Sequence, residues 1–147
     1  HWMVHSFPTR RSSDLKYSSA PGYTGFNQES LLEMRRQLPV DEISGDGIMK
    51  RGLIIRHLVL PNGVSGTEEV MRFIAENLPK EALISLMSQY LPYYKAAKEK
   101  DICRRLTLKE YNDARRVMHK YNLDKGWVQE SFGLERFAGV NIKAALK

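Results

Sequence analysis

Apolar and polar positions alternate along the chain in blocks that predict strands and helices in turn. The longest apolar block, residues 52–60, ends at a Pro-Asn-Gly turn, and its length is typical of a strand buried on both faces. Residues 67–77 carry apolar side chains at helical spacing behind two acidic residues, which predicts a helix. Residues 82–90 predict a second buried strand. Strand, helix and strand in succession predict a parallel βαβ unit with a right-handed crossover.

Two further helices are predicted on either side of this unit. Asn27 is suited to cap a helix that ends before Pro39, and the pair Thr107 and Glu110 forms a capping box that opens a helix reaching about residue 121. Two parallel strands cannot protect both edges of a sheet. We therefore expect an α/β fold that is a fragment of a partial (β/α) barrel, with one parallel βαβ unit and flanking helices.

The two ends of the chain differ from its middle. Residues 1–15 show no helical or strand period, and the stretch 7–15 resembles a translated sequencing adapter, so we expect a foreign and disordered tail. Residues 131–147 are expected to form a loosely packed tail. The folded domain is then predicted to span residues 16–130.

Composition places the chain among ordinary globular proteins and excludes several classes. Of the 147 residues, 42% are hydrophobic and 27% are charged, and no apolar run approaches the roughly 18 residues of a membrane span. Cys103 is the single cysteine, so an internal disulfide and a cysteine-only metal site are both excluded. These features predict a protein of the reducing cytoplasm without membrane contact.

The candidate chemistry begins with two cationic-type residues inside the first predicted strand. Strand alternation places Arg56 and His57 on opposite faces. A buried guanidinium is costly unless an anion meets it, and that anion is either an acid of the chain or a bound carboxylate or phosphate. His57 has two possible roles, a ligand-binding group or a neutral core histidine bonded to a backbone carbonyl.

Polar and aromatic residues follow the second predicted strand. Gln89, Tyr90 and Tyr94 lie where the carboxyl end of a parallel strand meets its loop, the usual edge for ligand binding in α/β folds. They are candidate cofactor-binding residues together with Arg56 and His57. The alternative is that the tyrosines are packing residues with a solvated hydroxyl group.

Four segments in order resemble one known family. The segments RGLIIRHLVLPN (51–62), EVMRFIA (69–75), ISLMSQYLPYYKA (84–96) and TLKEY (107–111) are similar to the C-terminal part of radical S-adenosylmethionine proteins that resemble pyruvate formate-lyase activating enzyme. The resemblance covers about residues 16–130. It implies a partial α/β barrel.

The resemblance also implies cofactors and a partner for a full-length parent. Such proteins hold a [4Fe–4S] cluster on three cysteines of a CxxxCxxC loop, cleave S-adenosylmethionine reductively, and abstract hydrogen from a partner protein. Arg56 matches the arginine that contacts the methionine carboxylate in the activating enzymes, and Tyr94 stands where they carry a histidine. The cluster loop is absent from this chain, so we expect the fragment to be inactive alone.

Two other functions remain open. The net charge of +6 and the interleaved basic and tyrosine residues of 104–121 are compatible with a non-enzymatic module that binds RNA or a protein. Nucleic acid is the less expected partner, because no RNA-binding motif accompanies the charge. A small phosphate-handling enzyme with Arg56 as an anion clamp is disfavoured, because no base or nucleophile is placed beside the arginine.

Overall fold

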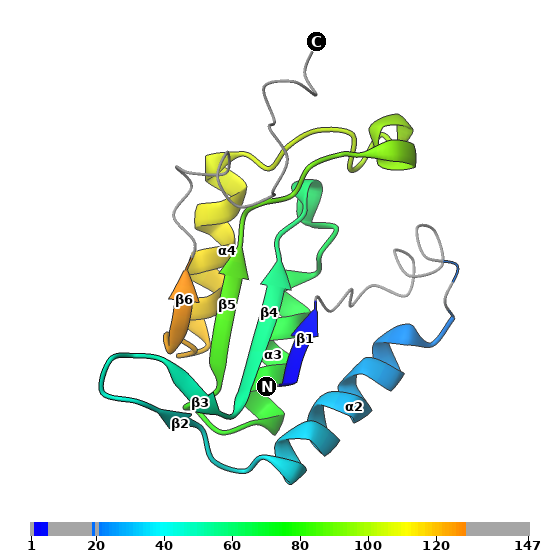
Figure 1. Ribbon diagram of the computed structural model, residues 1–147. Helices are drawn as coiled ribbons and strands as arrows, with labels where there is room; N and C mark the ends of the chain where they lie inside the picture. The colour runs from blue at the N-terminus through cyan, green and yellow to red at the C-terminus, as the bar shows by residue number, and fades with distance from the viewer. Residues whose placement is uncertain (1, 6–18, 20, 129–147) are drawn as a thin grey trace.

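The computed structural model describes residues 2–5, 19 and 21–128, and its centre is a parallel sheet (Figure 1). All three neighbouring strand pairs of this sheet run parallel. The predicted α/β class and the βαβ unit are therefore confirmed. In spatial order the strands are β1 (Trp2–His5), β4 (Leu53–Leu58), β5 (Leu83–Met87) and β6 (Gly126–Val128).

Between each pair of neighbouring strands of this sheet, the chain passes through one α-helix. The helices are α2 (Tyr23–Gln37), α3 (Thr67–Asn77) and α4 (Leu108–Lys120). Short elements complete the described chain: the antiparallel pair β2 (Glu42–Ile43) and β3 (Met49–Arg51), and the 3-10 turns η2 (Pro61–Gly63) and η3 (Tyr94–Lys98). No described helix is long and apolar enough to cross a membrane.

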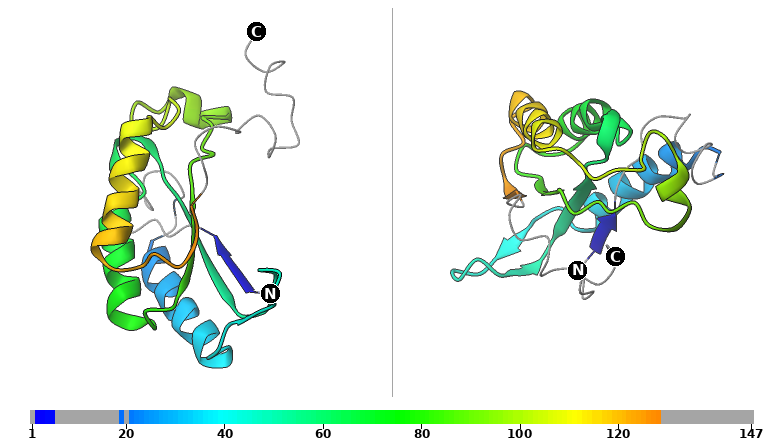
Figure 2. Two further views of the ribbon diagram at one scale, coloured as in Figure 1. Left: turned by 90° about the vertical axis from the view of Figure 1, so that its left-hand side faces the viewer. Right: turned by 90° about the horizontal axis from the view of Figure 1, so that it is seen from above.

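The helices cover one face of the sheet. Along β4, Leu53, Ile55 and His57 are buried, whereas the alternate residues Ile54 and Arg56 are half-buried. The buried set points toward α3 and α4, which lie side by side on one face of the sheet in both views of Figure 2. The opposite face of β4 and β5, called the open face below, has no described helix against it. The side chains on these two faces therefore meet different surroundings.

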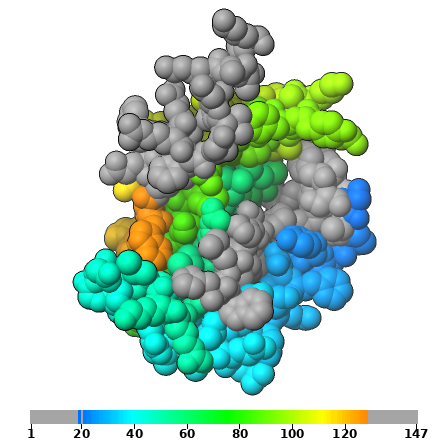
Figure 3. All heavy atoms as spheres, in the orientation of Figure 1, coloured from blue at the N-terminus to red at the C-terminus, as the bar shows by residue number. Residues whose placement is uncertain are grey.

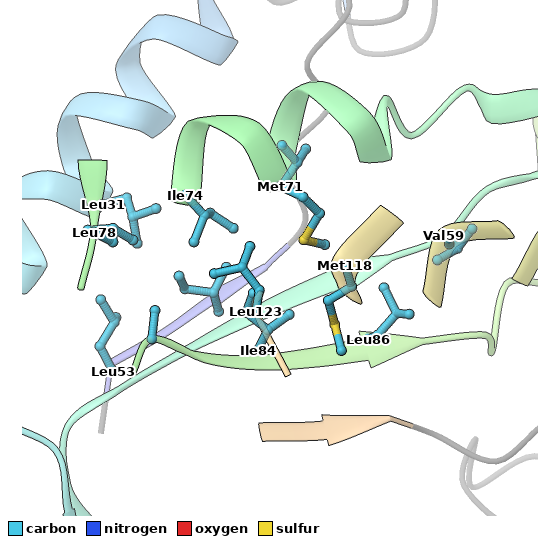
Figure 4. Packing of buried hydrophobic residues seen from close by; sticks show 14 of the residues in the cluster. Leu31, Leu53, Val59, Met71, Ile74, Leu78, Ile84, Leu86, Met118 and Leu123 are labelled. Carbon is cyan, nitrogen blue, oxygen red and sulfur yellow. The ribbon is translucent and has the colours of Figure 1, made fainter. Parts of the chain in front are cut away.

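The hydrophobic core fills the space between the sheet and the helices (Figure 4). Leu31 of α2, Ile74 of α3 and Met118 of α4 all join the same cluster as the buried residues of β4 and β5. Burial of such side chains stabilises by about 1.5–3 kcal/mol each, so this single layer supplies the main driving force for folding. Its fully or nearly fully buried members are Leu31, Leu53, Ile55, Val59, Val70, Met71, Ile74, Leu78, Ala82, Ile84, Leu86, Tyr111, Ala114, Met118 and Leu123.

Two strands differ from the expectation. Trp2–His5 falls inside the stretch expected to be disordered, yet its backbone pairs in parallel with β4. Gly126–Val128 was not among the predicted strands, and it pairs in parallel with β5. Both strands are short and occupy the edges that the βαβ unit leaves open, so they are defined by pairing and not by their own pattern. The expected tail of residues 131–147 lies outside the described residues.

Replacing Gly126 by alanine should weaken the attachment of β6. Gly126 has φ +118, a backbone conformation that side chains rarely adopt, and an added Cβ would collide with the backbone of Ile84. We expect a loss of about 1–3 kcal/mol in the free energy of unfolding, measured by urea titration with far-ultraviolet circular dichroism. Gly25 is the control, because its position has open space and alanine there should be neutral or stabilising. If Gly126→Ala were as stable as the unsubstituted chain, the close contact between Gly126 and the backbone of Ile84 would be contradicted.

Candidate functional site

Arg56 lies near the centre of the open face. It is half-buried, and the neighbouring strand places Ser85 directly beside it. Its Nε donates a hydrogen bond to Sδ of Met87 at 3.2 Å. A thioether is a weak acceptor, so this contact mainly orients the guanidinium. The sheet therefore holds a cationic fork over a mixed polar and apolar surface, an arrangement suited to a carboxylate or phosphate.

His57 lies on the opposite face, as strand alternation predicts. It is 0% exposed, and its Nε2 lies 3.0 Å from Oγ1 of Thr67 at the start of α3. Ser65 extends this pair, with its Oγ 3.2 Å from the same threonine oxygen. Burial lowers the pKa of His57 from 6.5 to about 4, so the ring is neutral at physiological pH. It is a core histidine bonded to a hydroxyl group, and it cannot contact the same ligand as Arg56.

The remaining predicted site residues do not converge on one point. The hydroxyl group of Tyr90 donates to the backbone oxygen of Ile102 at 2.8 Å, so this tyrosine anchors a loop. Tyr94 is 87% exposed and has a left-handed backbone with φ 54. Gln89 is half-buried just beyond β5. Within the described chain, Arg56 and Gln89 are thus the candidates that keep a partly enclosed position at the open face and its carboxyl edge.

A polar cluster at the carboxyl edge of the sheet was only partly foreseen. Glu110 accepts hydrogen bonds from the backbone of Asn62 and from both terminal nitrogens of Arg104, at 2.8–2.9 Å. It also completes the predicted capping box with Thr107. The Arg104 contact holds the pKa of Glu110 well below its usual range. The spacing of Thr107 and Glu110 predicts the capping box. The hydrogen bond from Arg104 to Asn62 joins residues 42 positions apart, so no local sequence pattern predicts it.

A cavity of about 310 Å³ lies on the helix side, between α3 and α4. Thr67 lines it, and so do four acids, Glu68, Glu69, Glu110 and Asp113. An acidic lining disfavours an anionic ligand. This cavity is therefore a poor match for a carboxylate or phosphate ligand.

The residues present do not fit an iron–sulfur cluster. Cys103 is the single cysteine of the chain and is exposed in the loop before α4. Among the described residues, no group of three histidine, cysteine, aspartate or glutamate side chains could hold a metal ion. Cluster binding in the manner of radical S-adenosylmethionine proteins needs three thiolates, so no step of a reaction is assigned to a cluster on this chain.

Comparison with known proteins finds one informative relative. The uncharacterized protein MJ0674 of Methanocaldococcus jannaschii is 48% identical over 73 residues, which is 49% of this chain and 21% of that protein. The chain spans about a fifth of the length of this relative. No family model matches the chain, and no solved structure matches it significantly. The name of the relative states no activity, so function has to be inferred from the residues.

Proposed function

We propose that the chain is the C-terminal part of a radical S-adenosylmethionine protein that resembles pyruvate formate-lyase activating enzyme. In the full-length parent, the expected activity is reductive cleavage of S-adenosylmethionine followed by hydrogen abstraction from a protein substrate. On its own, this chain is expected to be inactive, because it lacks the loop with the three cysteines that hold the cluster in such proteins. The setting of the parent would be the reducing cytoplasm, where exposed thiols such as Cys103 persist.

The order of the strands supports a barrel-like parent. The strands β4, β5 and β6 lie in the sheet in the order in which they follow along the chain, and a helix joins each neighbouring pair. Right-handed crossovers that always advance in one direction place all helices on the same face. That winding is the one found in (β/α) barrels, where the helix-free face becomes the interior. The open face would then line the inside of the partial barrel.

Arg56 carries the functional part of the proposal. It is a half-buried cation on the open face, and its Nε donates to Sδ of Met87, which fixes the position of the guanidinium on β4. The resemblance places the methionine carboxylate of S-adenosylmethionine at this arginine. A carboxylate there would receive a charge-assisted, forked hydrogen bond in a partly desolvated position.

Removal of either partner of this contact tests the proposal. We expect the chain to bind S-adenosylmethionine weakly in calorimetric titration, and to bind its decarboxylated analogue about tenfold or more weakly, because a hydrogen bond to a charged group contributes about 1.5–3 kcal/mol. Arg56→Ala should lower the affinity for S-adenosylmethionine by the same factor and leave the affinity for the analogue unchanged. Arg72→Ala, which removes an exposed arginine of α3, is the matched control and should bind both compounds as tightly as the unsubstituted chain.

Two results would contradict this assignment. If the unsubstituted chain bound both compounds equally, the carboxylate of S-adenosylmethionine would have no partner at Arg56. If Arg72→Ala lost as much affinity as Arg56→Ala, the effect would be one of net charge and not of a placed guanidinium. Circular dichroism of each variant shows whether the fold is retained.

A further inference from the structure

The connection between β5 and α4 forms a basic and aromatic surface loop, residues 93–105. It stands away from the carboxyl ends of β4 and β5 and includes η3 (Figure 1). The yellow-green atoms at the upper right of Figure 3 belong to this part of the chain. The loop has five cationic residues against the two acids Glu99 and Asp101. The cations are Lys95, Lys98, Lys100, Arg104 and Arg105.

The base of the loop is fixed by contacts from three elements. Ile102 is 8% exposed and its backbone oxygen accepts the Tyr90 hydroxyl. Asn62, in the turn after β4, donates from its side-chain nitrogen to the backbone oxygen of Asp101 at 2.7 Å. Arg104 is bound internally to Glu110. Anchoring of this kind lowers the ordering cost of binding, because the loop backbone is already positioned.

The other four cations of the loop point outward. Lys95, Lys98, Lys100 and Arg105 are exposed, and within the described chain none of their side chains forms an ion pair or hydrogen bond. Their charge is therefore available to a partner. At physiological salt, unpaired surface charges contribute mainly to contacts with an oppositely charged molecule that approaches them closely.

Two tyrosines accompany these cations. Tyr93 is 53% exposed and Tyr94 is 87% exposed. Tyr94 adopts a left-handed backbone, which costs a non-glycine residue about 1 kcal/mol, and Nζ of Lys95 lies 5.9 Å from its ring centroid. A strained backbone that keeps a large aromatic ring in water has no packing benefit in the isolated chain. Most of the surface of Tyr94, apart from the side of the ring that Lys95 approaches, is instead accessible for stacking.

We propose that this loop binds single-stranded nucleic acid. Stacking of bases on tyrosine rings combined with lysine contacts to phosphates is the common mode of single-strand binding. Lysine is depleted at protein–protein interfaces, which makes an acidic protein segment a poorer match for a loop with three free lysines. Bases within a duplex are already stacked on each other, so the exposed rings favour a single strand. The loop thus supplies a second function beside S-adenosylmethionine binding.

The number of free cations sets the expected salt dependence. Three to four phosphate contacts on a single strand give a slope of about −2 to −3 in a plot of log affinity against log salt concentration. Binding should therefore be measurable at low salt and weak at physiological salt. Fluorescence anisotropy of a labelled oligouridylate of about 12 nucleotides, titrated with the full chain, measures both quantities.

Two sets of variants separate placed contacts from general charge. Lys95→Ala/Lys98→Ala/Lys100→Ala should lower the affinity at least tenfold at about 50 mM salt and reduce the slope by about 2. The control Lys109→Ala/Arg115→Ala/Lys125→Ala removes three exposed cations elsewhere and should change the affinity less than threefold. Tyr93→Ala/Tyr94→Ala should also lower the affinity about tenfold, whereas the double phenylalanine variant retains it, because stacking needs only the ring.

Several outcomes would overturn the proposal. One is the absence of binding at low salt. Another is an equal loss in the two triple variants, which would mean attraction by net charge alone. A third is competition by polyglutamate as strong as that by unlabelled oligouridylate, which would indicate an acidic protein partner. Unchanged binding by the double tyrosine-to-alanine variant would exclude stacking. All substituted side chains are exposed, and circular dichroism checks that each variant folds.

Discussion

Replacing Tyr111 by alanine is expected to lower the free energy of unfolding by about 3–5 kcal/mol, the largest effect of any substitution considered for this chain. Tyr111 is 2% exposed and belongs to the core cluster beneath the sheet. Its hydroxyl group donates to the backbone oxygen of Leu86 in β5 at 3.0 Å. The change would leave a cavity between α4 and β5 and remove a bond that joins these two elements.

A second substitution separates the ring from the hydroxyl group. Tyr111→Phe keeps the ring and removes the donor to Leu86, so we expect a loss of about 1–2 kcal/mol. Tyr93→Ala is the control, because that ring is 53% exposed and its removal should change stability by less than about 0.5 kcal/mol. Urea unfolding curves with equal slopes measure all three. A cost for Tyr111→Ala no larger than that for Tyr93→Ala would contradict the packing of α4 on β5.

His57 is expected to make the chain acid-sensitive. Its pKa is about 4 in the folded protein against 6.5 for an ordinary histidine, because burial penalises the charged ring. Below pH 6.5 the unfolded chain binds a proton that the folded chain does not, so stability is highest above 6.5 and falls as the pH drops toward 4. At 1.36 kcal/mol per pKa unit, the total loss is about 3 kcal/mol.

The measurement is the free energy of unfolding as a function of pH. His57→Gln removes the titrating group and should flatten the curve between pH 6.5 and 4, whatever its effect on stability at neutral pH. His119→Gln is the matched control, since His119 is exposed and paired with Asp124, and it should retain the acid loss. If the free energy of unfolding of His57→Gln fell with pH as steeply as that of the unsubstituted chain, His57 would not be the cause of the acid sensitivity.

Glu110 adds a second acid effect in a lower pH range. Its pKa is depressed by Arg104 first, so its contribution is present above the ordinary pKa of a glutamate and is lost as the pH falls through the depressed value. The His57 effect begins above pH 5, where glutamates are still ionised in both states. The upper part of the curve therefore reports on His57 alone of these two residues.

The local pattern of the chain was enough to define α3 and the start of α4, whereas α2 begins at Tyr23 and not at the predicted cap Asn27. The predicted helix 67–77 matches α3 at both ends, and the Thr107 capping box opens α4 as expected. Helix formation depends on side chains three and four positions apart and on the capping residues of the first turn, and a short stretch of sequence contains both. For the same reason the opposite orientation of Arg56 and His57 followed from strand alternation alone.

The edges of the sheet and the partners of the polar residues were decided only by the tertiary structure. β6 has three residues and begins with a glycine, so it carries no strand pattern and forms because β5 offers unpaired backbone groups. Thr67 as the partner of His57, Met87 beside Arg56 and Arg104 on Glu110 likewise follow from folding. Sequence by itself determined what each segment prefers within a few residues of itself, because propensity and periodicity are short-range. Which distant segments meet depends on the burial of the whole core, and that is a property of the folded chain.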